Sequence, residues 1–401
     1  MRANVHKLPS RQISPSGGQL VERAADAIAA ARTNAVDVDR DGRFPREAFD
    51  ALRAARLLGA GVPTELGGLG AGMAALAALC AALGEACSPT GLIFAMHCVK
   101  VACIARHHGD DPWMIGFLED VAERQWLVAS STTEGARGGD IRNSEAAMRP
   151  HEGKLRLERR ASVISYAENA DALVTTARRS EDASSSDQVL VALRRADYAL
   201  TPLQGWDTFG MRGTCSKGFA LVATAEPSQI VGEDYALIHA QTMTPTAHLL
   251  WGAVWLGIAS EAYRRARDFT RAAARSAGGS LPPGAAKLSQ ARQSLDALRA
   301  LISRNAEAIE GAENGGRLNG VEVTMLKVEA SELALETVQS AMRVTGLAGY
   351  RNDGEFSCGR LLRDVMSGPI MINNERIVAG AHASLMMSEA PRASQFLPQG
   401  A

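Results

Sequence analysis

The sequence predicts an α+β protein built in the order helical, β, helical. Apolar residues recur at helical spacing through the first 126 residues, short runs rich in Val, Thr, Ser and Leu fill residues 127–232, and long helical patterns return afterwards. A chain of 401 residues has room for two or three domains, because a single core rarely grows beyond about 250 to 300 residues. We therefore expect an N-terminal helical domain at 1–126, a central antiparallel β domain at 127–232 and a C-terminal helical bundle at 233–401.

The N-terminal part reads as packed helices. Pro45 suits the first turn of a helix that continues to Leu58, and the glycine-rich stretch VPTELGGLGAG follows it. Two largely apolar helices come next, at residues 73–87 and 90–107, and the second carries His97. Because neither has a polar face, both are expected to pack between other helices.

The middle and last parts differ in periodicity. The runs WLVASSTTE, ASVISYAENADALVTTAR and DQVLVALR predict short antiparallel strands, separated by turns and by the polar surface loop SEDASSSD. The last part predicts four helices, at residues 245–275, 284–311, 321–345 and 370–387. These helices are long enough to form a bundle.

Composition excludes several classes of function. With 43 Lys and Arg against 44 Asp and Glu, the net charge is −1, so no basic field is available for nucleic acid or an anionic membrane. The longest apolar run, residues 247–259, is too short to span a bilayer, and the N-terminus lacks an apolar signal segment. The six cysteines show no CxxC spacing, which favours reduced thiols over disulfides or a metal site. We expect a cytoplasmic protein without a metal.

Five segments, in order between residues 62 and 365, resemble the acyl-CoA dehydrogenase family. VPTELGGLGAG is similar to its Gly-Gly-x-Gly loop, SSTTEGARGGD to its Thr-Glu-Pro-x-x-Gly-Ser-Asp segment, and SVISYAENAD to its Trp-Ile-Thr-Asn-Gly-Gly-x-Ala-Asp strand. RVTGLAGY and LLRDV resemble its C-terminal glycine and Arg-Asp motifs; we interpret Arg363 and Asp364 as a structural ion pair. The resemblance implies a helical domain, a central β-barrel and a four-helix bundle. It also implies a homotetramer or homodimer whose FAD sites are completed by a neighbour, with FMN the less expected flavin.

The resemblance also implies which residues hold the flavin. Thr133 would hydrogen-bond the edge of the isoalloxazine ring, and Ser165 would lie near flavin N5. Asn374 replaces a threonine that contacts the flavin, a role that its amide could keep. Three further residues are implied at the rest of the FAD: Arg271, Gly346 and Arg343, the last of them at the FAD of the neighbouring subunit.

The family's catalytic base is missing from both of its known positions. One aligns with Ile372 and the other with Ala247, and neither residue is a carboxylate. Three substitutes remain, each with a structural alternative. Glu375 lies one helical turn past the lost glutamate but is also favoured there by the helix dipole. His248 and His97 sit on apolar helices, where each is either a base or a packed, hydrogen-bonded histidine.

Because the family's base is missing, three functions remain open. The first is α,β-dehydrogenation of an acyl thioester, carried by CoA or by a carrier protein, with electrons passing to an acceptor flavoprotein. The second is a flavin monooxygenase that uses oxygen, in which His97 and Ser165 would support the reacting flavin. The third is a flavin-binding subunit without activity. Family breadth favours the first, and the missing glutamate favours the second. We place the dehydrogenase first.

Overall fold

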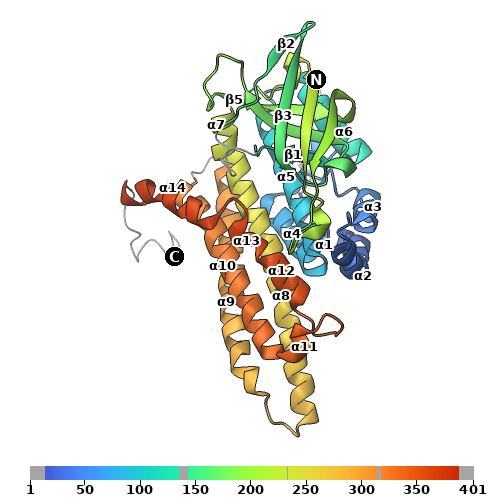
Figure 1. Cartoon of the computed structure of the whole chain (residues 1–401), viewed down its shortest axis with the longest axis vertical. Helices are drawn as coiled ribbons and strands as arrows, with labels where there is room; N and C mark the ends of the chain where they lie inside the picture. The colour runs from blue at the N-terminus through green and yellow to red at the C-terminus, as the bar shows by residue number, and fades with distance from the viewer. Residues whose placement is uncertain (1–13, 135–142, 233, 314–317, 388–401) are drawn as a thin grey trace, which may run out of the picture.

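The computed structural model describes residues 14–134, 143–232, 234–313 and 318–387. In Figure 1 the strands lie at one end, the N-terminal helices lie beside them, and three long helices run from the strands to the opposite end. Secondary structure changes from helix to strand between Arg124 and Val128, and back to helix between Ala225 and Tyr235. The domain boundaries at 126/127 and 232/233 stay a prediction.

The N-terminal region is helical, as predicted. Its helices are α1 (Gly17–Arg23), α2 (Ala25–Asp41), α3 (Arg46–Ala54), α4 (Met73–Ala86), α5 (Ser88–His107) and α6 (Pro112–Arg124). The two apolar helices predicted at 73–87 and 90–107 are α4 and α5. Among the described helices, α5 alone has the length and composition to cross a membrane, yet 89% of that segment is buried inside the protein, as in a core helix. All six cysteines are free thiols, as predicted.

The strands form two sheets. The first has three strands in the order β1 (Val128–Ser131), β4 (Ala172–Arg178) and β5 (Gln188–Arg194). The second has four strands in the order β2 (Arg149–His151), β3 (Lys154–Ile164), β7 (Lys217–Ala225) and β6 (Tyr198–Gln204). The predicted closed barrel is therefore wrong for the described strands, because no ladder joins the two sheets and each keeps its own edges. The prediction that all strands are antiparallel is also wrong, because β1 pairs with β4 in parallel.

The C-terminal region contains three long helices, α8 (Thr244–Ser276), α9 (Ala286–Glu313) and α10 (Gly320–Thr345). Gly84 on α4 lets α8 approach closely, because a Cβ there would lie 2.6 Å from the carbonyl oxygen of Val254. Shorter helices make up the rest of the region: α7 (Tyr235–Ile238), α11 (Leu347–Tyr350), α12 (Gly359–Val365), α13 (Ser367–Ile370) and α14 (Asn374–Met387).

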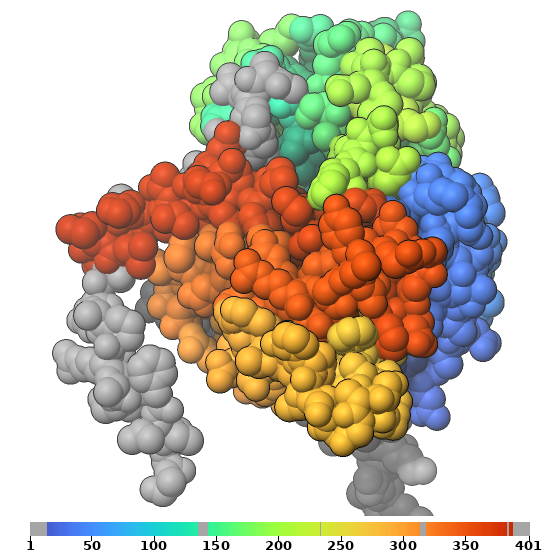
Figure 2. Space-filling view, turned by 60° about the horizontal axis from the view of Figure 1, so that its bottom comes forward, coloured from blue at the N-terminus to red at the C-terminus, as the bar shows by residue number. Residues whose placement is uncertain are grey.

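The helix predicted at 370–387 is divided in the structure. Ile372 and Asn373 have φ values of 59° and 57°, in the left-handed region, so α13 ends before them and α14 begins after them. As a result α14 points away from the axis of the long helices (Figure 1). Figure 2 shows this C-terminal segment, in red, between the strand region in green and the long helices in orange.

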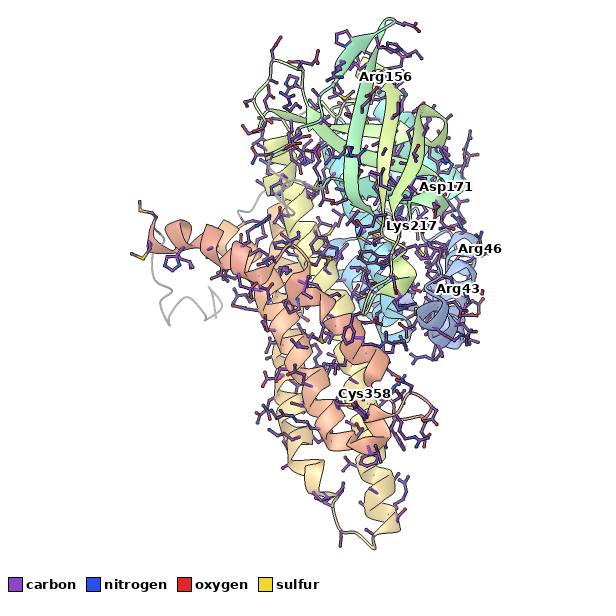
Figure 3. The ribbon with its side chains drawn as sticks, in the orientation of Figure 1. Arg43, Arg46, Arg156, Asp171, Lys217 and Cys358 are labelled. Atoms are coloured by element: carbon purple, nitrogen blue, oxygen red, sulfur yellow. The ribbon has the colours of Figure 1, made fainter. Side chains whose placement is uncertain are left out.

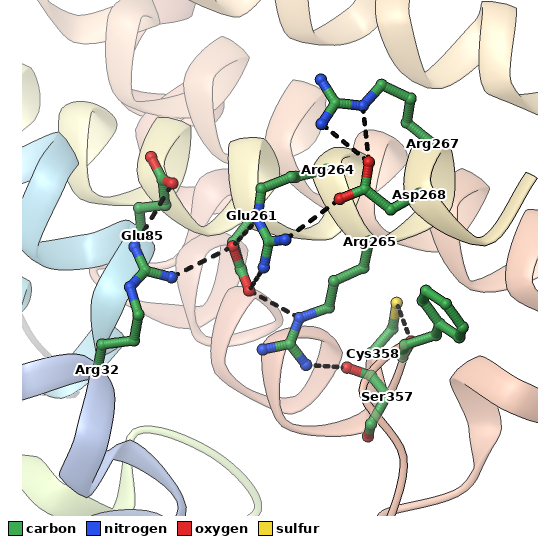
Figure 4. Close-up of polar contacts among 10 residues, drawn as sticks. Arg32, Glu85, Glu261, Arg264, Arg265, Arg267, Asp268, Ser357 and Cys358 are labelled. Atoms are coloured by element: carbon green, nitrogen blue, oxygen red, sulfur yellow. Dashed lines mark hydrogen bonds and ion pairs between the residues drawn. The ribbon is translucent and has the colours of Figure 1, made fainter. Parts of the chain in front are cut away.

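Polar contacts join the three regions. Glu261 on α8 is buried and pairs with Arg32 of α2 at 3.6 Å and with Arg264 and Arg265 at 2.7 and 2.8 Å (Figure 4). Burial raises the pKa of Glu261, but the guanidinium groups of Arg264 and Arg265 lower it below its usual value. On the other side, Arg53 of α3 pairs at 3.3 Å with Asp171, which Figure 3 shows beside the N-terminal helices. The first set of contacts joins α8 to the N-terminal helices, and the second joins those helices to the strand region.

Candidate active site

A cavity of about 820 Å³ lies where the three regions meet. Its walls come from α5, the ends of β1 and β3, the segment between β6 and β7, the start of α8, and α12 with α13. This volume is within the range of sites that enclose small molecules and cofactors. The walls are mostly apolar, with aromatic side chains at Trp206, Phe209 and Trp251. Among the described residues of the lining, none is an aspartate or a glutamate.

Both positions where the family carries its base lie in this lining. They are occupied by Ile372, in the left-handed turn before α14, and by Ala247, on α8. The two positions that the resemblance assigns to the base thus lie at one cavity, and neither side chain there can accept a proton.

A chain of hydroxyl groups reaches the cavity from the strand region. Thr214 Oγ1 donates to the carbonyl oxygen of Met211 at 2.8 Å and lies 2.8 Å from Ser216 Oγ, which lies 2.8 Å from Ser165 Oγ. A hydroxyl has one hydrogen, and that of Thr214 is already given to Met211. Ser216 must therefore donate to Thr214, and Ser165 to Ser216. Ser165 then presents only lone pairs to the cavity.

Thr133 lines the same cavity, next to the end of β1. Its Oγ1 donates to the carbonyl oxygen of Val163 on β3 at 3.4 Å, at the long end of hydrogen-bond distances. The structure thus brings together Thr133 and Ser165, the two residues that the sequence predicts at the flavin ring.

His248 is the one predicted base that lines the cavity. Its Nδ1 is 2.8 Å from the carbonyl oxygen of Val323, so Nδ1 carries the hydrogen and donates it. Burial lowers the pKa of His248 to about 4, which makes the ring neutral at pH 7. Nε2 then keeps a lone pair, and it has no hydrogen-bond partner among the described residues.

His97 lies outside the cavity lining and is buried. Its Nε2 is 2.7 Å from the carbonyl oxygen of Leu58, to which it donates, and its Nδ1 accepts from the backbone N–H of Val128 at 3.0 Å. Burial lowers its pKa to about 4. Both ring nitrogens are thus used in joining α5 to the segment after α3 and to β1.

Asn374 and Glu375, at the start of α14, also lie outside the lining. The Asn374 amide accepts from Lys327 Nζ at 2.7 Å and donates to Glu332 at 2.7 Å and to Ser331 at 3.0 Å, so its hydrogen bonds are made to α10. Glu375 is exposed to solvent. In this chain the Asn374 contacts anchor the turn at Ile372.

The three residues predicted at the rest of the FAD lie apart from the cavity. Arg271 is near the end of α8, Arg343 is in the last turn of α10, and Gly346 follows α10 with φ +54°. All three are exposed. The chain by itself does not bring them to Thr133 and Ser165.

Arg363 and Asp364 do not pair with each other, which corrects the sequence interpretation. Arg363 lines the cavity and is paired with Asp39 of α2 in a two-point contact, while Asp364 Oδ1 accepts from the backbone N–H of Met211 at 2.7 Å. Neighbouring residues of a helix point about 100° apart, so they rarely face each other.

Sequence reasoning missed Lys100. This lysine is on α5, is 3% exposed and lines the cavity together with Met96 and Leu92. These residues are spaced by four along the helix, so a single lysine on the apolar stripe Leu92-Met96-Lys100 was the available signal.

A helical–β–helical chain with a ligand-sized cavity between sheets and helices, edged by a chain of hydroxyl groups, is the arrangement that the resemblance to flavin-dependent oxidoreductases implies. The family comparison agrees. The N-terminal domain of acyl-CoA dehydrogenase matches residues 18–123 and its C-terminal domain matches residues 240–386. The chain belongs to the acyl-CoA dehydrogenase family and is a flavoenzyme of that type.

The chain is also similar to enzymes that are not named as acyl-CoA dehydrogenases. The chain is 28% identical over 382 residues to L-evernosamine nitrososynthase of a Micromonospora species, covering 90% of this chain and 87% of that protein. It is 26% identical over 253 residues to dibenzothiophene monooxygenase of Rhodococcus erythropolis, covering 61% and 60%. The crystal structure of FMN-bound TdsC from Paenibacillus sp. A11-2 has the same fold, with a TM-score of 0.80, 19% identity, and coverage of 93% of this chain and 98% of that one.

Proposed function

We propose that this protein is a flavin-dependent monooxygenase that works with reduced flavin and oxygen. The observation that carries the proposal is that both base positions of the dehydrogenases lie in the cavity lining and hold Ile372 and Ala247. When bound, reduced flavin would react with oxygen, pass one oxygen atom to the substrate and release the other as water. This reaction needs no carboxylate at the α-carbon of a thioester. Similarity to a nitrososynthase and to a dibenzothiophene monooxygenase supports the proposal.

The hydroxyl chain fits a site that holds reduced flavin, as a monooxygenase requires before it reacts with oxygen. Flavin N5 accepts a hydrogen bond when the ring is oxidised and donates one when it is reduced. Ser165 presents an acceptor, because its hydrogen is held by Ser216 and the chain ends on the carbonyl of Met211. With Ser165 at N5, as the family resemblance implies, the chain favours reduced flavin. Thr133 would contact the edge of the same ring, and the apolar lining around Trp206 would exclude water.

FMN is the flavin that we propose, in place of the FAD that the family resemblance implied. The solved structure of TdsC is similar in fold and contains FMN. In this chain Arg271, predicted at the second half of FAD, is exposed and outside the cavity lining. Electrons would arrive as reduced FMN supplied in solution or by a reductase.

A thioester dehydrogenase is the second candidate, and His248 is the observation that favours it. Its Nε2 lone pair belongs to a residue of the cavity lining and has no described partner, so it could accept an α-proton from an acyl-CoA or a carrier-bound acyl chain. In that case His248→Ala should slow anaerobic flavin reduction by a factor of about 10² to 10⁴, the usual loss for a general base. Glu375→Gln serves as the control, because Glu375 is exposed.

The experiment that tests the proposal compares the affinities for oxidised and reduced FMN, titrated anaerobically. Wild type should bind reduced FMN more tightly. Ser216→Ala removes the group that holds the hydrogen of Ser165, so Ser165 becomes able to donate and the preference should move toward oxidised FMN. Thr201→Ala, an exchange on β6 outside the cavity lining, is the control. A preference that is the same in wild type and Ser216→Ala would count against the role of the hydroxyl chain.

A further inference from the structure

We infer that the cavity recognises a substrate with one anionic oxygen group, a carboxylate or an ionised phenol, which binds Lys100 on α5. This deepens the proposed function, on which it rests, by naming the substrate class. Three features carry it: a buried cation in the lining, a second hydrogen-bond donor without a partner, and the absence of described acidic side chains from the lining.

Lys100 is a buried cation in an apolar wall. Its side chain is 3% exposed, and the contact that its ammonium makes is with the sulfur of Met243, at 3.4 Å. A thioether is a weak acceptor and neutralises no charge. The nearby guanidinium of Arg159 has its own buried carboxylate, Glu134, at 3.3 Å. No described carboxylate therefore compensates Lys100.

An uncompensated ammonium group in an apolar wall destabilises the fold unless an anionic ligand binds beside it. A buried charge without a partner destabilises a protein by several kcal/mol, so buried lysines are normally paired or serve a site. The other charged group of the lining, Arg363, shows the contrast, because it is paired with Asp39 and donates to the carbonyl oxygen of Phe209 at 2.9 Å. Among the described residues of the lining, Lys100 is therefore the cation whose charge a bound ligand can balance.

Trp251 supplies the second donor. Its ring is part of the cavity lining, and its indole Nε1 is buried with no hydrogen-bond partner among the described residues. Indole N–H is a donor only, so it also seeks an acceptor atom. Two donors and apolar walls suit a flat apolar molecule with one anionic oxygen.

The same features argue against a protonated amine as the group held at Lys100. Two cations close together repel each other, and no described acidic side chain of the lining would offset that repulsion. Burial lowers the pKa of Lys100 to about 8, which still leaves most of it charged at pH 7. A bound anion would raise that pKa again.

The test measures binding to the FMN-loaded protein, without turnover, by calorimetry with matched pairs of probes. Benzoate is compared with benzamide, and 4-nitrophenol with 4-nitroanisole, which cannot ionise. Wild type should prefer the anionic member of a pair by about 10-fold or more, as expected for a charge-assisted hydrogen bond. A preference for benzoate over benzamide identifies a carboxylate as the group that binds Lys100. For 4-nitrophenol, the yellow colour of the phenolate should appear on binding at a pH where the free phenol is colourless. That colour change identifies an ionised phenol as the group that binds Lys100.

Two variants distinguish a ligand-binding role of Lys100 from a role in stabilising the fold. Lys100→Met keeps the length of the side chain but removes the charge, so it should abolish the preference and, by removing an uncompensated buried charge, raise the melting temperature. Lys154→Met, an exchange of an exposed lysine on β3, should change neither. Equal binding of both members in both wild-type pairs, or a preference that persists in Lys100→Met, would overturn the inference. A lower melting temperature for Lys100→Met would also overturn it, because it would assign Lys100 a structural role. Because no turnover is measured, these outcomes do not depend on whether the enzyme is an oxygenase.

Discussion

Replacing His97 by alanine should destabilise the protein rather than remove a catalytic group. The change leaves the carbonyl of Leu58 and the N–H of Val128 buried without partners, where the ring now bonds them at 2.7 and 3.0 Å. Each unpaired buried group costs about 1 to 3 kcal/mol, so we expect a loss of about 3 to 5 kcal/mol once the lost packing is included. Globular proteins are stable by only about 5 to 15 kcal/mol, so urea unfolding will detect this.

The pH dependence makes this prediction specific to His97. Its pKa is about 4 in the folded protein and would be about 6.5 when unfolded, so the unfolded chain binds more protons between these values. The stability that the neutral ring provides is complete above pH 6.5 and is lost as the pH falls toward 4. The difference in free energy of unfolding between wild type and His97→Ala should therefore shrink from pH 7 to pH 5.

The control is His151→Ala, because His151 is exposed on β2 and its loss should leave stability unchanged. The reasoning is refuted if His97→Ala unfolds at the wild-type urea concentration at pH 7 while its turnover is lost. That result would make His97 a catalytic residue, as the sequence-based monooxygenase hypothesis proposed.

Three other outcomes are expected. Ser165→Ala should weaken binding of reduced FMN about 2- to 12-fold, the equivalent of one hydrogen bond of about 0.5 to 1.5 kcal/mol, with circular dichroism unchanged; unaltered affinity would make Ser165 an ordinary strand-end residue. Arg343→Ala should leave flavin affinity unchanged in titrations, because FMN lacks the half of FAD that Arg343 is predicted to contact in a neighbouring subunit, and a loss of flavin would favour FAD instead. Ile372→Glu places a carboxylate in an apolar wall, where burial raises its pKa, so this variant should be bleached by an acyl thioester when wild type is not; equal bleaching of both would contradict this.

Much of the fold was predictable because it follows from strong local patterns. The apolar helices α4 and α5 and the long helices α8 to α10 begin and end within a few residues of their predicted limits, since α4 and α5 are long apolar runs and α8 to α10 have a long 3.6-residue periodicity. The sheets were harder. Whether strands close into a barrel depends on pairing between distant segments, and the parallel pairing of β1 with β4 cannot be read from alternation alone.

The site was predictable only where a residue lies in a matching motif. Thr133 and Ser165 follow from ordered segments, and both reach the cavity. The positive φ angle of Asn373 is common for asparagine, but that of the β-branched Ile372 is disfavoured, so the turn that separates α13 from α14 depends on tertiary contacts such as that of Asn374 with Lys327. The importance of Lys100 depends on what surrounds it in space, which no spacing in α5 reveals.

The most direct test of the central claim is the reaction of oxygen with protein-bound reduced FMN, followed by the visible absorbance of the flavin in a stopped-flow instrument. If the protein is a monooxygenase, oxidised flavin should return in two separable steps, the second slower than the oxidation of free reduced FMN, because the apolar cavity protects the reacting flavin from water. Reoxidation in one step at the rate of free FMN, in a preparation whose bound flavin is bleached anaerobically by an acyl thioester, would contradict the account and establish the dehydrogenase.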